Sequence, residues 1–157
     1  MIAVVSSGHK PDDERIYHKE IQSLLKAGYE IQYFTRSNSK ICLSEKNLKH
    51  FNVSPIKYYI NKYINYVAEN IDNAAVVLHI HEFELLPLAK KLKRKRNVKI
   101  IYDVHESNCE MWDMFSSKPY PINKLINKLL WYFERYHLRY IDIIITVTEK
   151  LVDRYLQ

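Results

Sequence analysis

The feature that most constrains the fold of this chain is a set of short segments that are apolar on both faces. The runs AAVVLHI (74–80), which belongs to a strand expected at 75–81, and IDIIITV (141–147) lack the regular apolar and polar alternation of a sheet with one wet face. A further strand is expected at 98–104. Strands of this kind are typical of parallel sheets that helices cover on both sides. The sequence therefore predicts a parallel sheet enclosed by helices.

Helical patterns alternate with these strands along the chain. Apolar residues recur at helical spacing over four segments, Glu14–Ala27, Pro55–Asn70, 83–96 and 121–139, and a last helix is expected to begin near Glu149. Further strands are predicted at Ile2–Val5, 29–35 and, as a short strand, Phe51–Val53. We predict one domain over residues 1–157, a three-layer α/β/α Rossmann-like fold with a mainly parallel sheet.

Length and composition fit an intracellular globular domain. A chain of 157 residues is long enough for one ordinary core, and its 2 cysteines, Cys42 and Cys109, form no disulfide framework or metal motif. The N-terminal run reads as a first strand rather than a signal peptide, and no apolar run is long enough to span a bilayer. We expect the protein in the cytoplasm, free or peripheral to the inner face of the membrane.

The net charge of +6 permits an anionic partner without choosing one. The densest basic run, Lys90–Arg96, falls at the end of a predicted helix, where cations interact favourably with the helix dipole, and no nucleic-acid motif surrounds it. Nucleic acid is therefore not the expected partner. The basic and apolar segment at 121–140 is interpreted as a helix that covers the core, with contact to an anionic membrane as the alternative.

Polar side chains gather where the predicted strands end. His81 and Glu82 end one strand, His105 and Glu106 end the next, and Gly8 and His9 follow the first. Ligands of open parallel sheets bind outside the carboxyl ends of the strands, so these three loops are predicted to form one cleft. His79 lies deeper in its strand and is interpreted as a hydrogen-bonded core histidine.

A metal site and a cysteine nucleophile were the other chemical interpretations. His79 and His81 share a face of their strand and could ligate a metal, but no third ligand at a fixed spacing is evident. Cys109 has only His105 nearby in the sequence to support a nucleophilic role. Neither interpretation was favoured.

Four stretches in the same order resemble one branch of glycosyltransferase family 4. They are HKPDDERIYHKEIQSLLKAGYEI, HIHEFELLPLA, IIYDVHES and IDIIITVTEKL. The resemblance runs along most of the chain, and residues 37–73 are the least informative. The resemblance implies half of a GT-B enzyme, in which two Rossmann-like domains bind the acceptor and the nucleotide-sugar donor. It implies sugar transfer with retention of anomeric configuration, without a metal or other cofactor.

The resemblance also implies roles for residues of this chain. His81, His105 and Glu106 match residues that line the transfer site, and Gly8 and His9 match the loop near the donor diphosphate and the acceptor. Asp13, Arg15 and Glu82 are assigned to substrate binding on the same basis. Many relatives carry a Gly-Gly pair in the first loop, whereas this chain has only Gly8.

Three hypotheses follow for the function. The first is the acceptor-side domain of a retaining hexosyltransferase that builds capsular or surface polysaccharide on a sugar or lipid-linked sugar acceptor, inactive without a donor-binding domain or partner chain. The second is a binding or regulatory module that uses the same cleft and pairs with another chain. The third is a basic domain that binds nucleic acid through Lys90–Arg96.

Overall fold

The sheet has six strands, all parallel, in the order β3-β2-β1-β4-β5-β6. The computed structural model describes residues 1–105 and 108–156. The strands are β1 (Ile2–Val5), β2 (Ile31–Arg36), β3 (Leu48–Val53), β4 (Val77–Ile80), β5 (Lys99–Val104) and β6 (Ile143–Thr146). This order is that of the Rossmann fold: the chain adds strands on one side of β1 up to β3, then crosses to the other side with β4, and all strands stay parallel. The predicted fold class is therefore confirmed.

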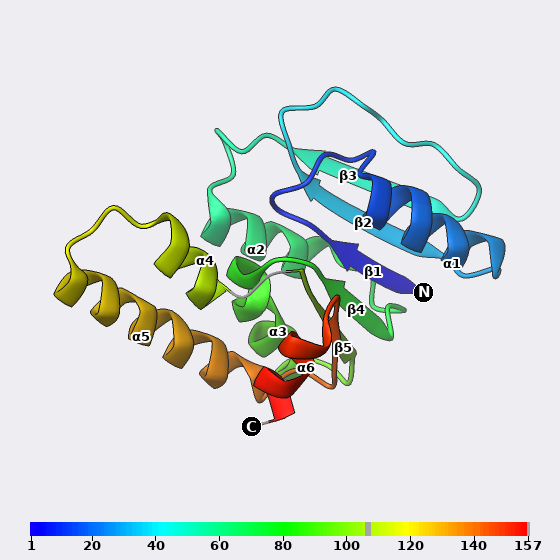
Figure 1. The fold of residues 1–157 in the computed structure, drawn as a ribbon. Helices are drawn as coiled ribbons and strands as arrows, with labels where there is room; N and C mark the ends of the chain where they lie inside the picture. The colour runs from blue at the N-terminus through cyan, green and yellow to red at the C-terminus, as the bar shows by residue number, and fades with distance from the viewer. Residues whose placement is uncertain (106–107, 157) are drawn as a thin grey trace.

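Helices cover both faces of this sheet. Figure 1 shows α1 on one face, beside β1 and β2, and α2 and α3 on the other. The helical elements are the π-helix η1 (Glu14–Ile21), α1 (Gln22–Lys26), α2 (Ile60–Asn70), the short 3₁₀ helix η2 (Phe83–Leu85), α3 (Leu86–Lys93), α4 (Asn108–Phe115), α5 (Tyr120–Leu138) and α6 (Glu149–Leu156). The predicted three layers are therefore present.

Alternate residues of β1 enter two separate cores. Ala3 and Val5 of β1 join the larger core with α2 and α3, whereas Val4 joins a smaller core with η1. The same alternation on β4 and β5 sends Leu78, Ile80, Ile100, Tyr102 and Val104 into the larger core. The intervening polar residues, His79 on β4 and Asp103 on β5, therefore lie on the face that η1 covers.

Several predicted element boundaries were wrong. The helix expected from Pro55 begins at Ile60, after a turn, because Tyr59 has extended backbone angles at the N-cap position. The helix expected at 83–96 is η2 followed by α3, which ends at Lys93. Helix α4 was not predicted at all, and β3 is twice as long as the three-residue strand expected there.

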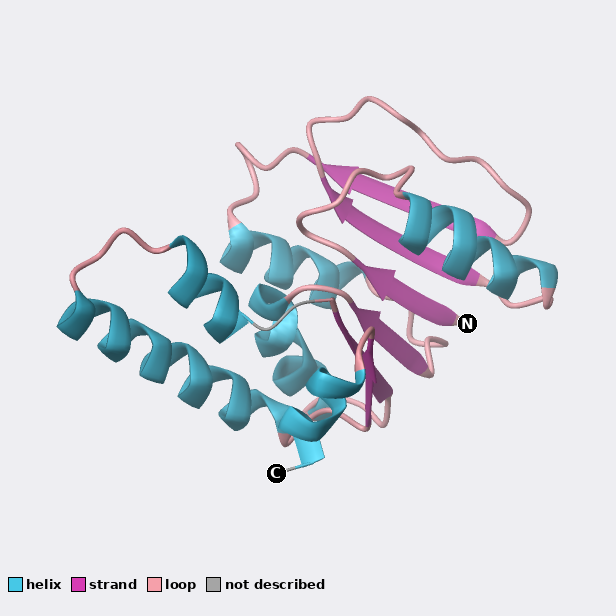
Figure 2. Ribbon diagram, viewed as in Figure 1, coloured by secondary structure: helices cyan, strands magenta, loops and turns pink. Residues whose placement is uncertain are grey.

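Helices α4 and α5 form a hairpin that extends away from the sheet (Figure 2). Much of the apolar surface of this hairpin is exposed, including Met114, Phe115, Tyr120, Leu125 and Leu129. Within residues 1–105 and 108–156, no helix combines the length and the apolar character needed to cross a bilayer.

Candidate functional site

The loops that follow β1 and β4 and the end of β5 meet at the carboxyl edge of the sheet. They enclose a pocket of about 330 Å³ lined by His9, His81, Glu82, Phe83, Glu84, Tyr102 and His105. The expected clustering of histidines and acids from three loops is therefore present. Glu106, which was predicted to accompany His105, lies outside the residues that the structure describes.

Glu82 ties the loop after β1 to the loop after β4. Its Oε1 accepts hydrogen bonds from Ser6 Oγ at 2.7 Å and from the backbone N–H of Gly8 at 3.0 Å. Burial raises the pKa of this carboxyl even though these donors favour its charged form. Its second oxygen, Oε2, is buried without a hydrogen-bond partner among the described residues. Glu82 thus fixes the backbone at Gly8 and is also one of the residues that line the pocket.

The start of η1 holds His9 in place. Asp13 is the N-cap residue, and its Oδ1 accepts hydrogen bonds from the backbone N–H groups of Arg15 and Ile16, both at 3.0 Å. Its other oxygen lies 2.9 Å from His9 Nδ1. Both oxygens of Asp13 thus have partners within the chain and hold His9 and the start of η1, and its role in binding substrate stays a prediction.

The π-helical winding of η1 places two charged residues over the sheet. Hydrogen bonds in a π-helix join residues five apart, as from the His18 N–H to the Asp13 carbonyl at 3.2 Å. Arg15 and Glu20 are also five residues apart, and Arg15 Nε donates to Glu20 Oε1 at 3.2 Å. An α-helix, which the sequence predicted here, would turn these two side chains to different sides. The π-helix therefore brings Arg15 to His105, at 3.5 Å, and Glu20 to His81, at 3.6 Å.

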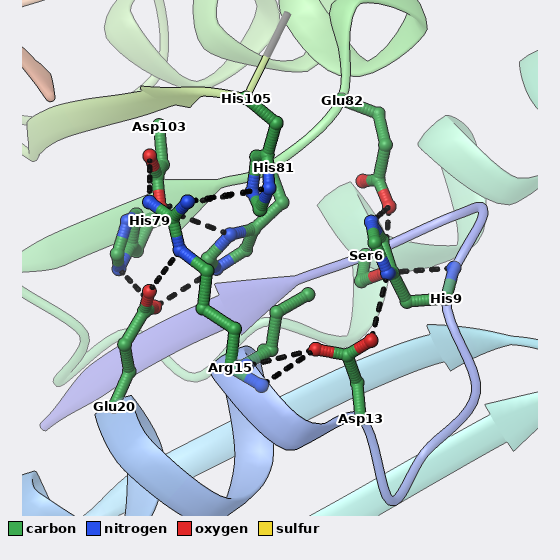
Figure 3. A network of polar contacts seen from close by, with 11 residues as sticks. Ser6, His9, Asp13, Arg15, Glu20, His79, His81, Glu82, Asp103 and His105 are labelled. Atoms are coloured by element: carbon green, nitrogen blue, oxygen red, sulfur yellow. Dashed lines mark hydrogen bonds and ion pairs between the residues drawn. The ribbon is translucent and has the colours of Figure 1, made fainter. Parts of the chain in front are cut away.

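Arg15 also connects η1 to β5. Its Nη2 donates to both carboxylate oxygens of Asp103, each at 2.7 Å, and its Nη1 lies 3.5 Å from His105 Nδ1. Figure 3 shows Arg15 between the carboxylates of Glu20 and Asp103, with His79, His81 and His105 around them. Arg15, assigned to substrate binding from the sequence, is thus paired with two acids inside the chain.

Electrostatics fix the protonation state of this cluster. Burial alone would raise the pKa of Asp103, but His81, Arg15 and His105 outweigh it and hold the pKa at about 2. Burial lowers the pKa of His79 to about 3 and also lowers the pKa of His105. His79 and His105 are therefore neutral at physiological pH, and neutral imidazole can accept a hydrogen bond from a hydroxyl or bind a metal.

Two of the histidines differ from what the sequence predicted. His81 lines the pocket, as expected, but its side chain is completely buried, because Arg15 and Glu20 of η1 lie against it. His79 is buried as predicted, but its Nε2 has no hydrogen-bond partner among the described residues. His105 remains a quarter exposed and borders the pocket. His9 and His105 are thus the histidines a ligand would reach first.

Asp103 and Glu20 are site residues that the sequence interpretation passed over. Asp103 lies two residues before His105 on the same strand face, so the period of two could have placed them together. The sequence contains no comparable pattern for Glu20, because Glu20 reaches His79 and His81 only through the π-helical winding of η1. Together with His79 and His81 these two acids form a group of four possible metal ligands, so the missing third ligand is supplied by the fold.

Comparison with known proteins identifies the family. The sequence profile described as Glycosyltransferase Family 4 matches residues 14–157. The chain belongs to this family. The resemblance stated from the sequence is therefore confirmed, and the chain is a glycosyltransferase-type domain. No protein in the curated set matches it significantly.

Solved structures support the same fold over the whole chain. Sucrose-phosphate synthase from Thermosynechococcus elongatus superimposes with a TM-score of 0.67 and 15% identity, over 99% of this chain and 44% of that protein. A structure from E. coli described as trehalose-6-phosphate bound with UDP-2-fluoro glucose gives a TM-score of 0.60 and 16% identity, over 99% of this chain and 41% of that one. The family 4 domain thus spans less than half the length of either protein.

Proposed function

We propose that this family 4 domain is the acceptor-side half of a retaining glycosyltransferase that takes a sugar, of the hexosyl type, from a nucleotide-sugar donor. The observation that carries the proposal is the pocket in which His9, Glu82 and His105 meet at the carboxyl edge of the sheet. The family match and the partial coverage of both solved structures support a second, donor-binding domain or partner chain.

The chemistry of the pocket suits an acceptor sugar. With Nδ1 accepting from Arg15 Nη1 at 3.5 Å, neutral His105 would donate a hydrogen bond from Nε2 to a sugar oxygen. Glu82 Oε2 is a carboxyl oxygen without a partner among the described residues. Sugar transfer develops oxocarbenium-like positive charge, which fixed carboxylates and imidazoles stabilise. In this proposal His81 acts from behind the pocket, as part of the buried cluster that holds Asp103 and His105.

We also propose that the transfer step itself needs no metal or other cofactor, as the family resemblance implies. So does a role in capsular or surface polysaccharide assembly in the cytoplasm, with a sugar or lipid-linked sugar as acceptor. No contact in the described part of the chain selects the donor sugar. The polysaccharide role therefore rests on the resemblance of the four sequence stretches to one branch of the family.

The alternative of nucleic-acid binding has less support than the sugar cleft. Several cations of the basic run have partners inside the domain: Lys93 pairs with Asp142 at 2.6 Å, and Arg96 donates to the Asp72 carbonyl at 2.8 Å. Lys90 and Lys91 donate to Tyr136 and Asn65, each at 2.5 Å. These contacts agree with the simpler interpretation of a helix end held by its neighbours.

We predict that the isolated chain binds a nucleotide-sugar only weakly, with a Kd above roughly 1 mM, because half a cleft forfeits both orientation and charge stabilisation. Isothermal titration calorimetry with a set of nucleotide-diphosphate sugars measures this directly. The same chain joined to a family 4 donor domain is the positive control. Micromolar binding of a nucleotide-sugar by residues 1–157 alone would contradict the proposal that a separate domain binds the donor.

Peripheral contact with an anionic membrane is supported by one face of α5. Apolar and aromatic side chains recur three and four residues apart along its exposed surface, namely Ile122, Leu125, Leu129, Tyr132 and Tyr136. Four exposed cations, Lys124, Lys128, Arg135 and Arg139, flank them. An exposed apolar stripe beside a row of cations suits the surface of a bilayer that contains anionic lipids. Such contact would bring the cleft near a lipid-linked acceptor.

We expect the chain to bind vesicles that contain phosphatidylserine and not vesicles of neutral lipid. Since each basic residue near such a surface contributes about 1 kcal/mol, the pair Lys124→Glu and Lys128→Glu should weaken binding by at least roughly 30-fold. The matched control reverses two exposed lysines elsewhere, Lys26→Glu and Lys49→Glu. Equal loss in both double variants, measured by co-sedimentation, would contradict a role for α5 in membrane contact.

A further inference from the structure

Four side chains that can ligate metals meet behind the pocket, on the face of the sheet covered by η1. They are Glu20 of η1, His79 of β4, His81 just after β4, and Asp103 of β5, and one potential ligand atom from each lies within 4.8 Å of the others. Three separate elements supply these four residues. The arrangement therefore depends on the tertiary fold and not on a local sequence motif.

The polar atoms of this group lack the hydrogen bonds that buried groups normally make. Both ring nitrogens of His81, whose side chain has no exposed surface, have no hydrogen-bond partner among the described residues. Neither does His79 Nε2 or Glu20 Oε2. A buried polar group without a partner costs about 1–3 kcal/mol, and one explanation for such a group in a folded protein is a bound ion.

The spacing of these atoms fits ligands that share one ion. His81 Nε2 lies 3.6 Å from Glu20 Oε2, and His81 Nδ1 lies 3.6 Å from Asp103 Oδ2. His79 Nδ1 lies 4.0 Å from Glu20 Oε2. These separations are too long for hydrogen bonds. His81 meets Glu20 and Asp103 through different ring nitrogens, so only one of these nitrogens can ligate an ion. One candidate atom from each of the four residues lies within 4.8 Å of the others. Two ligands bound tetrahedrally at 2.0–2.1 Å stand roughly 3.3 Å apart, so the four side chains would draw together around an ion.

We propose that Glu20, His79, His81 and Asp103 form a binding site for a divalent transition metal ion of the Zn²⁺ class. Two imidazoles with two carboxylates suit Zn²⁺ and its first-row neighbours better than Mg²⁺ or Ca²⁺, which prefer oxygen ligands. The site lies behind the pocket, so the ion would fix the side chains that support His105 and would not contact the donor diphosphate. It is thus compatible with a transfer step that needs no metal.

Arg15 completes the surroundings of this site. Its guanidinium donates to both oxygens of Asp103 and to Glu20 Oε1, which leaves Glu20 Oε2 directed at the histidines. Carboxylate ligands in metal sites are commonly held by hydrogen bonds of this kind. The Arg15 guanidinium thus holds both carboxylates of the group in place and leaves the two imidazoles as the remaining candidate ligands.

The test is metal binding by the chain itself, freed of any affinity tag and stripped with a chelator. We expect one equivalent of Zn²⁺ to bind in calorimetry and to raise the Tm, and Co²⁺ to give the absorption bands of a tetrahedral site with nitrogen ligands. Glu20→Gln and His79→Gln should each weaken Zn²⁺ binding by more than the roughly 10- to 100-fold that loss of a supporting hydrogen bond costs. His18→Gln, an exposed histidine on the same helix, should bind as the parent does.

Two results would overturn the proposal. One is the absence of Zn²⁺ and Co²⁺ binding by the folded parent chain, whose fold is verified by circular dichroism, and this result does not depend on any variant. The other is binding that survives in folded Glu20→Gln and His79→Gln but is lost in His18→Gln, which would place the ion on the surface. Neither readout involves sugar transfer, so failure here is distinct from failure of the proposed function.

Discussion

Replacing Asp103 by Asn is expected to destabilise the domain by on the order of 3 kcal/mol at neutral pH. Asp103 is 1% exposed and accepts both hydrogen bonds from Arg15 Nη2. The variant leaves the Arg15 guanidinium beside a neutral amide, and removing one partner of a buried ion pair strands the charge of the other. Urea unfolding of the chain and the variant measures the difference.

The same measurement at low pH checks the cause of this effect. The pKa of Asp103 is lowered from an ordinary 3.8 to about 2 in the folded chain. A carboxyl with a depressed pKa stabilises the fold above its unfolded pKa, and this stabilisation is lost as the pH falls through the folded pKa. The gap between parent and Asp103→Asn should therefore be complete above pH 3.8 and shrink toward pH 2.

The exposed carboxylate of Glu14, on η1, provides the control. Glu14 lies 3.5 Å from Lys19, and both side chains are mostly exposed. Surface pairs of this kind contribute little, so Glu14→Gln should change stability by less than about 0.5 kcal/mol. An Asp103→Asn variant as stable as Glu14→Gln would contradict the account of the buried cluster.

Replacing His105 by Ala is expected to have the largest effect on transfer, on the order of a 10²-fold fall in kcat for the chain joined to its donor domain. His105 borders the pocket and lies 3.5 Å from Arg15. Loss of a hydrogen bond that strengthens as charge develops in the transition state lowers kcat. Loss of a contact made equally to bound substrate and transition state would instead raise KM alone. The Tm should fall less than in His81→Ala, since the His105 side chain is a quarter exposed whereas that of His81 is fully buried.

His81→Ala should behave differently from His105→Ala. The sequence suggested that both histidines face the cleft, but the buried side chain of His81 predicts a loss of stability together with the loss of transfer. His18→Ala, on the exposed side of η1, is the matched control for both and should retain full activity. Thermal melts recorded beside the transfer assay separate the two effects.

The helix and sheet layers, and the edge of the sheet that carries the pocket, could be predicted from the sequence because strands have a period of two residues. Strand residues two apart share a face, so the apolar runs around Leu78 and Ile80 and around Ile100 and Tyr102 identified strands buried on both sides. Parallel strands end at a common edge, and this placed His9, His81 and His105 together without a structure.

The parts that could not be predicted depend on tertiary contacts. Glu20 reaches the histidines because η1 winds as a π-helix, and apolar periodicity does not distinguish a π-helix from an α-helix over eight residues. The burial of His81 depends on which strands η1 covers, which the order of the strands decides. Helix α4 has eight residues, too few for its apolar pattern to stand out.

The measurement that tests the central claim most directly is sugar transfer by the chain joined to its family 4 donor domain, compared with its double variant His81→Ala and His105→Ala. We predict that the double variant binds the nucleotide-sugar as the parent does, through the donor domain, but has lost at least roughly 100-fold in kcat. A double variant that folds and transfers sugar at the parent's rate would contradict the assignment of this pocket as the place of transfer.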